Sequence, residues 1–246
     1  MYGFSVFLSA QTASFRDPGA QLYHATLPMP PVSTIIGIAG SALGFAFDAA
    51  WKYFKDNRIS VGVIKRTQSE KEPGQGLDLW KYRKLKSGNN IESDIVKREF
   101  LFQVAYQLCY GAEEKSVINE LYQAFNNPHW ALTLGNSDDL AKIDKVSIVT
   151  ELEAAAPTIE LKECLVIGDH TQDFLFVWED IKNKPLNVKL NLPMTKSLPV
   201  DFTFSSNGVR TASKFSYFTF LTELHKLRNP GESYYFEQNV AQLICI

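Results

Sequence analysis

Arg16, Tyr23 and His24 stand close together near the start of the sequence and carry a guanidinium, a phenol and an imidazole. Such a group has the parts for acid–base chemistry without a metal, because one member can activate a hydroxyl group while another stabilises developing charge. The opposing interpretation is that His24 is structural, since a solitary histidine is more often a hydrogen-bond partner than a catalyst. The residue types alone leave both interpretations open.

Basic side chains are concentrated between residues 52 and 98. This range contains twelve lysines and arginines and six acidic residues, although the net charge of the chain is only −2. A basic block in an otherwise acidic chain is typical of a nucleic-acid site, but a solvated, lysine-rich loop has the same composition. Within the block, Trp80 and Tyr82 alternate with cations, the mixture that single-stranded nucleic acid uses for base stacking and phosphate pairing. The cations are Lys81, Arg83, Lys84, Lys86, Lys97 and Arg98.

The composition argues against several other classes. Three cysteines, far apart and odd in number, favour a reducing compartment, and they form no zinc-site spacing with the four histidines. Adjacent carboxylates at Asp138 and Asp139 suit a turn as well as a metal. The apolar run from Ile35 to Phe47 is too short for a membrane span. We therefore expect a cytoplasmic protein with no metal, no cofactor and no membrane contact.

The spacing of apolar residues predicts strands at 2–9, 58–67, 99–110 and 129–135, and helices at 33–47 and 114–125. This order is that of an α+β, ferredoxin-like (split βαβ) domain, which we place at residues 1–140. Residues 68–98 form an insertion, and their "SGNN" turn signal predicts a protruding β-hairpin. Residues 141–246 show strand patterns and no long helix, so we expect a mostly β C-terminal extension.

The predicted helix at 33–47 has an unusual composition on one side. Prolines precede Ser33 and Thr34, which favour a helix start, and small residues follow at Gly37, Gly40 and Gly44. Each mid-helix glycine costs about 1 kcal/mol relative to alanine, so something should gain from close approach to this helix. Either RNA or a neighbouring subunit approaches it, or the glycines pack the helix on its own sheet.

The stretch "FRDPGAQLYHATLPMPPVSTIIGIAGSALG" resembles the N-terminal signature of the CRISPR-associated Cas-five family, a branch of the RAMP superfamily. "KREFLFQV" and "NNPHWALTLGNSDD" resemble later segments of that family, so the resemblance covers roughly the first 140 residues. The form of "TLPMPPVST" is nearer to type I-A and I-B members than to I-C or I-E. One branch of the family is a handle-processing endoribonuclease, but the sequence around Tyr23 and His24 does not resemble that branch.

The resemblance implies a non-catalytic subunit of the type I CRISPR surveillance complex (Cascade), serving antiviral defence or RNA-guided DNA targeting. Such a subunit binds the 5′ handle of the guide RNA (crRNA), caps the backbone filament and contacts the large subunit, so that target DNA is met only through the complex. A Cas-type endoribonuclease and an unrelated ferredoxin-like interaction module remain as alternatives. The residues that we expect to contact RNA are Arg16, Tyr23, His24, Ser33, Thr34, Lys65, Arg66, Trp80, Lys81, Tyr82, Arg83, Lys84, Lys86, Lys97, Arg98 and Arg210.

Overall fold

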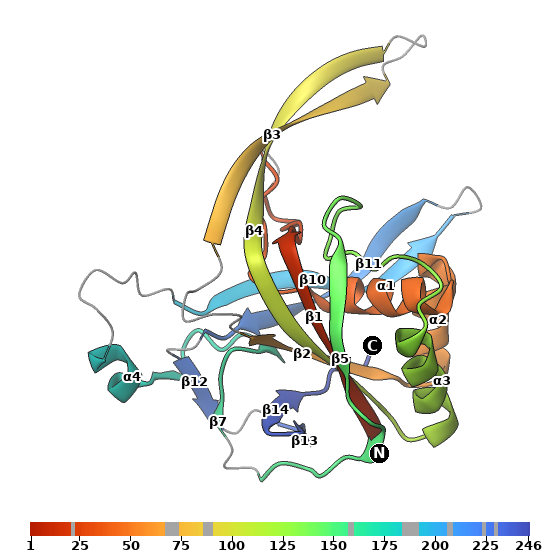
Figure 1. Cartoon of the computed structure of the whole chain (residues 1–246). Helices are drawn as coiled ribbons and strands as arrows, with labels where there is room; N and C mark the ends of the chain where they lie inside the picture. Colours follow the sequence, from red (N-terminus) through yellow and green to blue (C-terminus); the bar gives the residue numbers. More distant parts are fainter. Residues whose placement is uncertain are drawn as a thin grey trace.

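A computed structural model describes residues 1–20, 23–66, 74–85, 91–156, 160–183, 192–205, 209–222, 225–228 and 231–246. Its central sheet has the strand order β2-β4-β1-β5, and every pair of neighbours is antiparallel. These strands are β1 (Tyr2–Ala13), β2 (Ser60–Arg66), β4 (Ile91–Ala112) and β5 (Ala141–Val146). Helices α1 (Val32–Leu43), α2 (Phe47–Asp56) and α3 (Lys115–Asn126) cover one face of this sheet (Figure 1).

The alternation of side chains along β1 explains the two layers. Phe4, Val6 and Leu8 point to one face and are fully buried in the core beneath the helices. Ser5 and Phe7 point to the opposite face, where residues of the second half of the chain cover part of the sheet. The result is a mixed α/β fold with a core on each side of the central sheet.

The helix expected at 33–47 ends at Leu43, and a second helix, α2, begins at Phe47 at an angle of 103° to the first. α1 ends at Leu43 because Gly44 adopts a left-handed conformation (φ +76°), and the Phe45 amide bonds back to the Gly40 carbonyl. α1 begins one residue earlier than expected, after Pro31, and no side chain caps it. Within the described ranges, no single helix is long and apolar enough to span a bilayer, and only the bent α1–α2 pair reaches that length and composition.

The side of α1 that carries Gly37 and Gly40 packs against α2. A Cβ atom built on Gly40 would lie 2.7 Å from the Cβ of Ala50, and one built on Gly37 would lie 3.7 Å from the Phe47 ring. The glycines therefore bring two helices of the same chain together. The expectation that they pack α1 on the sheet of this domain is wrong for these two positions, and an approach of RNA or a neighbouring subunit to this helix stays a prediction.

The insertion is a β-hairpin, as predicted. β3 (Gly74–Leu85) pairs with the first half of β4, and the two strands project from the body of the molecule (Figure 1). We call this hairpin, residues 74–85 and 91–102, the thumb. β4 is one strand of 22 residues that runs from the thumb into the middle of the sheet. Gln103 has a positive φ (56°) where the neighbour of β4 changes from β3, which pairs as far as Phe102, to β2, which pairs from Ala105.

The second half of the chain is mostly β, as expected, and forms several small sheets. The strand orders are β10-β11-β8, β7-β12-β9 and β13-β14, while β6 adds to β1. The bounds are β6 (Thr150–Glu151), β7 (Glu160–Leu161), β8 (Leu165–Ile167), β9 (Phe174–Phe176), α4 (Trp178–Lys182), β10 (Met194–Phe204), β11 (Arg210–Phe220), β12 (His225–Arg228), β13 (Ser233–Phe236) and β14 (Asn239–Gln242).

The strand expected at 129–135 is not part of the central sheet. Its segment covers the end of α1 instead, since the amides of His129 and Trp130 donate to the carbonyls of Ala42 and Ser41. The fourth strand of the sheet is β5, which begins after residue 140. Division of the chain into two domains stays a prediction.

Candidate nucleic-acid interface

The segment that carries Arg16, Tyr23 and His24 doubles back on itself beside the sheet. The Asp17 amide donates to the Ala25 carbonyl at 2.9 Å, and Arg16 and Thr26 form an antiparallel bridge. Asp17 is buried and binds Lys196 of β10 at 2.6 Å. This loop, residues 14–20 and 23–27 (loop 14–27 below), is thus anchored from the second half of the chain, while Arg16 itself is exposed.

Backbone hydrogen bonds attach this loop to the base of the thumb. The His24 amide donates to the Lys97 carbonyl at 2.8 Å, and the Glu99 amide donates to the His24 carbonyl at 2.8 Å. The Glu99 carboxylate also accepts the Thr26 amide at 3.1 Å. Two segments separated by some seventy residues of sequence therefore form one continuous surface.

The imidazole of His24 lies edge-on to Trp80, with ring centroids 6.1 Å apart. Burial lowers the pKa of His24, and the positive charges of Arg16 and Arg98 lower it further. Near neutral pH this histidine is an uncharged ring in a cationic environment. Tyr23, with 42% of its surface exposed, precedes it in the loop.

Arg98 is buried at the same junction. Its Nη2 atom lies 2.6 Å from an oxygen of Asp78 on β3 and 3.4 Å from one of Asp138, and its guanidinium lies over the Trp80 ring. Only 8% of the residue is exposed, and within the described part of the chain its Nη1 has no hydrogen-bond partner. Hydrogen bonding to Asp78 raises the pKa of Arg98 despite the opposing effect of burial. Arg98 thus holds carboxylates of the protein and is not presented at the surface.

Strand alternation sorts the other thumb residues onto two faces. In an antiparallel pair, directly opposite residues share a face. Trp80 is opposite Val96 and Tyr82 is opposite Asp94, so the aromatic side chains lie on the face of Asp78 and Arg98. The Tyr82 hydroxyl donates to Asp94 at 3.2 Å. We call this the aromatic face.

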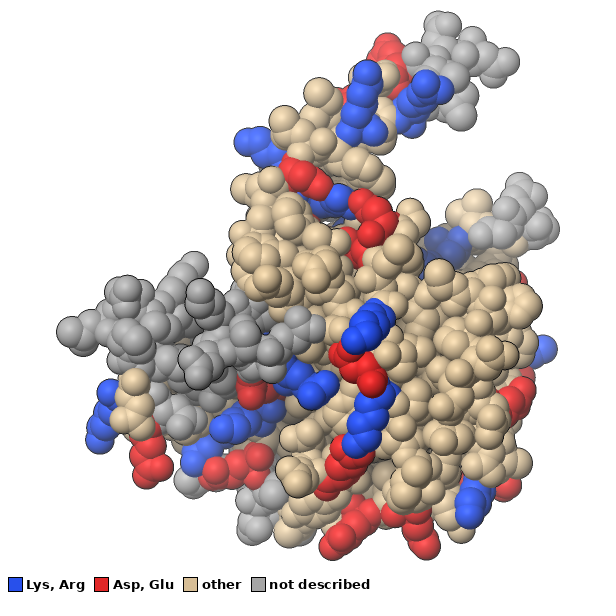
Figure 2. Space-filling view, in the orientation of Figure 1, with Lys and Arg blue, Asp and Glu red and all other residues tan. Residues whose placement is uncertain are grey.

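The exposed cations Lys81, Arg83 and Lys97 lie on the opposite face, the cationic face. Leu79 and Ile95 lie among them and are 70% and 61% exposed. Side chains of both charges are visible along the thumb in Figure 2. The aromatic residues therefore share one face of the hairpin with Arg98, while the exposed cations Lys81, Arg83 and Lys97 lie on the other face.

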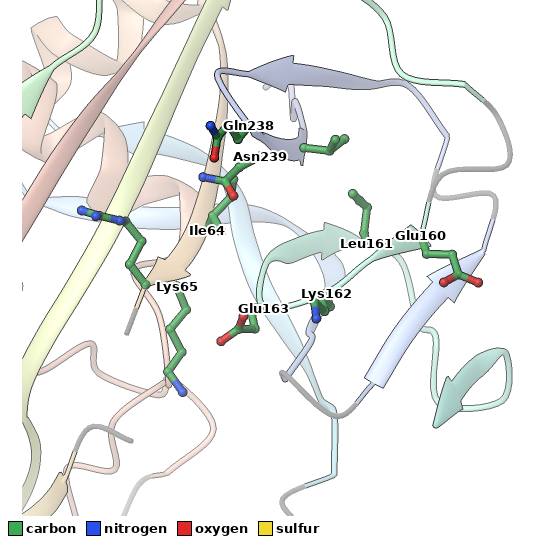
Figure 3. A pocket seen from close by; sticks show the side chains of 10 residues that line it. Ile64, Lys65, Glu160, Leu161, Lys162, Glu163, Gln238 and Asn239 are labelled. Carbon is green, nitrogen blue, oxygen red and sulfur yellow. The ribbon is translucent and has the colours of Figure 1, made fainter. Parts of the chain in front are cut away.

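Lys65 and Arg66 lie at the end of β2, where they line a cavity of about 490 Å³. The other walls come from residues 160–163 and 238–240 (Figure 3). Arg66 places its guanidinium 4.7 Å from the centre of the Phe7 ring, on the face of the sheet opposite the α1–α3 layer. Arg66 therefore does not join the loop–thumb junction, and Lys65 forms part of the wall of this cavity.

Arg210 is also separate from the junction. It begins β11 and stacks on Phe47 of α2 at 4.2 Å and on Phe202 of β10 at 5.0 Å. Ser33 and Thr34 lie in the first turn of α1, and within the described chain neither is bonded to another predicted site residue. The side chain of Lys84 and the whole of Lys86 lie outside the described residues.

The adjacent carboxylates of Asp138 and Asp139 have different roles. Asp139 is buried and accepts hydrogen bonds from Thr12 at 2.6 Å and Ser14 at 3.0 Å. Asp138 binds Arg98, and hydrogen bonding to that guanidinium lowers the pKa of Asp138. Across the described ranges, no three metal-ligating side chains cluster together.

Sequence reasoning missed the acidic residues that build the junction. Asp78 and Glu99 lie within or beside the basic block, where the sequence shows them only as charges, and Asp138 has the sequence context of a turn or metal residue. The role of Asp78 could have been predicted from the sequence, because an isolated acidic residue on a basic hairpin needs a partner across the strand pair. The contact of Asp138 depends on the tertiary fold and has no local signal.

Solved structures share this fold. A chain of a structure titled "CRISPR RNA-guided surveillance complex" matches with a TM-score of 0.53 and 14% identity, over 91% of each chain. A CRISPR protein from Archaeoglobus fulgidus matches over the whole of both chains, with a TM-score of 0.57 and 10% identity. At these identities the similarity shows the fold alone. No curated protein sequence matches the chain.

The family is shown by sequence. The family model described as "CRISPR-associated protein (Cas_Cas5)" matches residues 6–210. The chain therefore belongs to the CRISPR-associated Cas-five family, as the signature around residues 15–44 predicted.

Proposed function

We propose that this chain is a non-catalytic subunit of a type I CRISPR effector complex (Cascade) that binds the 5′ handle of the crRNA. The N-terminal sheet and its helices act in this proposal as a ferredoxin-like RNA-binding domain. The strand order β2-β4-β1-β5, with helices between β1 and β2 and between β4 and β5, supports that assignment. Membership of the Cas-five family supports the proposed role as a subunit of a CRISPR effector complex.

The observation that carries the proposal is the junction between the loop and the thumb. His24 is bonded through its backbone to Lys97 and Glu99, and its ring meets Trp80. Exposed Tyr23 precedes His24 in the loop, and the charge of exposed Arg16 acts on the His24 ring. The Trp80 indole that this ring meets is 42% exposed. A cation for a phosphate and aromatic rings for unstacked bases are what single-stranded RNA recognition requires.

The remaining partners follow from the same proposal. The cationic face of the thumb contacts RNA or the adjacent backbone subunit, and the acidic second half contacts the large subunit. Target DNA is met only through the complex. The chain acts in the cytoplasm in antiviral defence or RNA-guided DNA targeting, and its subtype is nearer to I-A or I-B.

The alternative function is metal-independent cleavage of repeat RNA, and one observation favours testing it. His24 has a lowered pKa and lies in the electrostatic environment of Arg16, so it is an uncharged base beside a cation. Its backbone bonds and its contact with Trp80 support a structural role instead. Incubation of repeat RNA with wild type, His24→Ala and Tyr23→Phe separates the two, because only an enzyme would yield a product that these substitutions abolish.

The test of the main proposal is to purify the tagged chain from its native host and sequence the RNA that accompanies it. Short RNAs sharing one repeat-derived 5′ end, together with other complex subunits, are the expected result. A preparation with protein partners and no RNA would overturn handle binding and leave a protein-interaction role. RNAs without a common 5′ end would overturn the specificity for a handle.

A further inference from the structure

We propose that Arg98 is a positioning residue, which with Asp78 and Asp138 fixes the thumb and loop 14–27 in the orientation that RNA requires. This inference rests on the proposed function. It assigns to Arg98 a role different from the RNA contact that its position in a basic block predicts. The three side chains together are called the clamp below.

One arm of the clamp lies within the thumb. Asp78 is directly opposite Arg98 in the β3–β4 register, and both of its oxygens accept from Arg98, from Nε at 3.1 and 3.2 Å and from Nη2 at 2.6 Å. A planar guanidinium makes such a two-pronged contact and an ammonium group does not. This arm fixes the position of the guanidinium on the hairpin.

The other arm reaches the body of the molecule. Asp138 accepts from Nη2 of Arg98 at 3.4 Å and belongs to a turn that is firmly attached to β1. Its neighbour Asp139 is buried against Thr12 and Ser14, and the Ser14 amide donates to the Leu134 carbonyl. The ion pair with Asp138 therefore links a projecting hairpin to a fixed point on the sheet.

The clamp also supports the RNA surface itself. Arg98 lies between Lys97 and Glu99, the two residues whose backbone groups bond His24. Its guanidinium lies over Trp80 at 5.3 Å from the ring centre. A change in the position of Arg98 therefore moves the thumb, the indole and loop 14–27 together, without removing any group that faces solvent.

The negative charge of Asp138 provides a test, because the clamp and simple electrostatics predict opposite changes in RNA affinity when that charge is removed. A carboxylate near an RNA site repels phosphate, so its removal should strengthen binding by simple electrostatics. If Asp138 instead holds the clamp, Asp138→Asn weakens binding of a 5′ handle RNA, by about two- to fivefold for a partly exposed ion pair. The matched control is Asp94→Asn, because Asp94 lies on the same face of the thumb and, among the described residues, its hydrogen bonds stay within the thumb.

The experiment measures RNA affinity and amide hydrogen exchange on the full-length chain. Asp138→Asn and Arg98→Lys should each speed exchange in β3 and the first half of β4 without RNA, and each should weaken RNA binding at an unchanged salt slope. Asp94→Asn should leave exchange at the base of the thumb unchanged and should not weaken binding. Arg98→Lys tests the two-pronged geometry, since it keeps the charge.

Unchanged or stronger RNA binding by Asp138→Asn, with exchange at the thumb base like that of wild type, would overturn the clamp. Wild-type RNA affinity and wild-type hydrogen exchange in Arg98→Lys would also overturn the clamp, because a single positive charge without the two-pronged contact would then hold the thumb in place. If wild type itself binds no handle RNA while the variants still speed exchange, the proposed function fails and the clamp stands as a purely structural feature.

Discussion

Gly40 of α1 lies so close to Ala50 of α2 that a Cβ atom on the glycine would sit 2.7 Å from the alanine Cβ. The two helices meet at 103°, and Gly44 with its positive φ makes the turn between them. The glycines of the family signature thus form a helix–helix contact. Gly37, one turn earlier, leaves ordinary contact distance to the Phe47 ring.

This geometry predicts opposite effects for two identical substitutions on one helix. Gly37→Ala should stabilise the protein by about 0.5–1 kcal/mol, because alanine favours the helix and the added methyl group fits at 3.7 Å. Gly40→Ala gains the same propensity but forces two backbone-fixed Cβ atoms apart, which costs about 1–3 kcal/mol. Urea unfolding of both variants measures the change in the free energy of unfolding for each. A stabilised Gly40→Ala variant would show that α2 can move away from α1 at little cost.

Much of the fold follows from periodicity in the sequence, because buried strands and helices repeat their apolar residues at 2 and 3.6 positions. The thumb follows from a turn signal between two strand-like stretches. The break at Gly44 was missed because apolar residues continue across it to Phe47, and only the left-handed backbone of the glycine shows that a second helix has begun. The edge strand β5 was missed because apolar and charged side chains alternate only from Ala141 to Asp144, after which the register against β1 shifts.

The site was harder to predict because it depends on pairing across the chain. Alternation alone places Trp80 and Lys81 on opposite faces of a strand, so the separation of aromatic and cationic residues was predictable in principle. The register of β3 against β4, and with it the Asp78–Arg98 pair, depends on the length of the turn. The approach of loop 14–27 to the thumb and the contact of Asp138 with Arg98 come only from the tertiary fold.

The two faces of the thumb predict two different signatures in RNA binding. Trp80→Ala should lower affinity by about 1–3 kcal/mol for one stacked base while leaving the salt dependence of binding unchanged. Combined replacement of Lys81, Arg83 and Lys97 by glutamine should reduce the slope of log K against log salt by about 0.7 for each phosphate that the variant no longer neutralises. Fluorescence anisotropy with a labelled handle RNA at several salt concentrations measures both quantities.

An unchanged slope in the combined variant would assign the cationic face to a protein partner. In that case yield of the assembled complex should fall instead, and co-purification of the other subunits measures this. Tyr82→Phe is a suitable control for Trp80→Ala, since it removes only the hydroxyl that bonds Asp94 within the thumb.

Arg16 is predicted to contact RNA directly, because it is exposed at the junction and no ion pair within the described chain occupies it. Arg16→Gln should weaken handle binding and lower the salt slope by about 0.7, the value for one phosphate contact to a single strand. Lys196→Gln provides the contrast, because Lys196 pairs with buried Asp17 and should affect the anchoring of the loop more than the slope. Equal slopes for Arg16→Gln and wild type would remove Arg16 from the RNA site.

His24 is predicted to make both stability and RNA binding depend on pH. Burial first, and then Arg16 and Arg98, lower its pKa from the ordinary value of 6.5, so the unfolded chain binds the proton more readily. The free energy of unfolding therefore contains a contribution that is complete above the unfolded pKa and is lost as pH falls below it. His225 should act in the same direction because burial lowers its pKa as well.

An RNA phosphate beside His24 should have the opposite effect on the same ring. A nearby negative charge favours the imidazolium, so the pKa of His24 should rise on binding and the RNA complex should take up protons and tighten as pH falls from 7 towards 6. NMR titration of His24 with and without handle RNA measures the change directly, and His24→Gln should abolish the pH dependence of affinity. An identical His24 titration curve in the free and RNA-bound chain would place the phosphate elsewhere on the surface, whereas a shift of His225 alone would indicate a change in folding and not a contact.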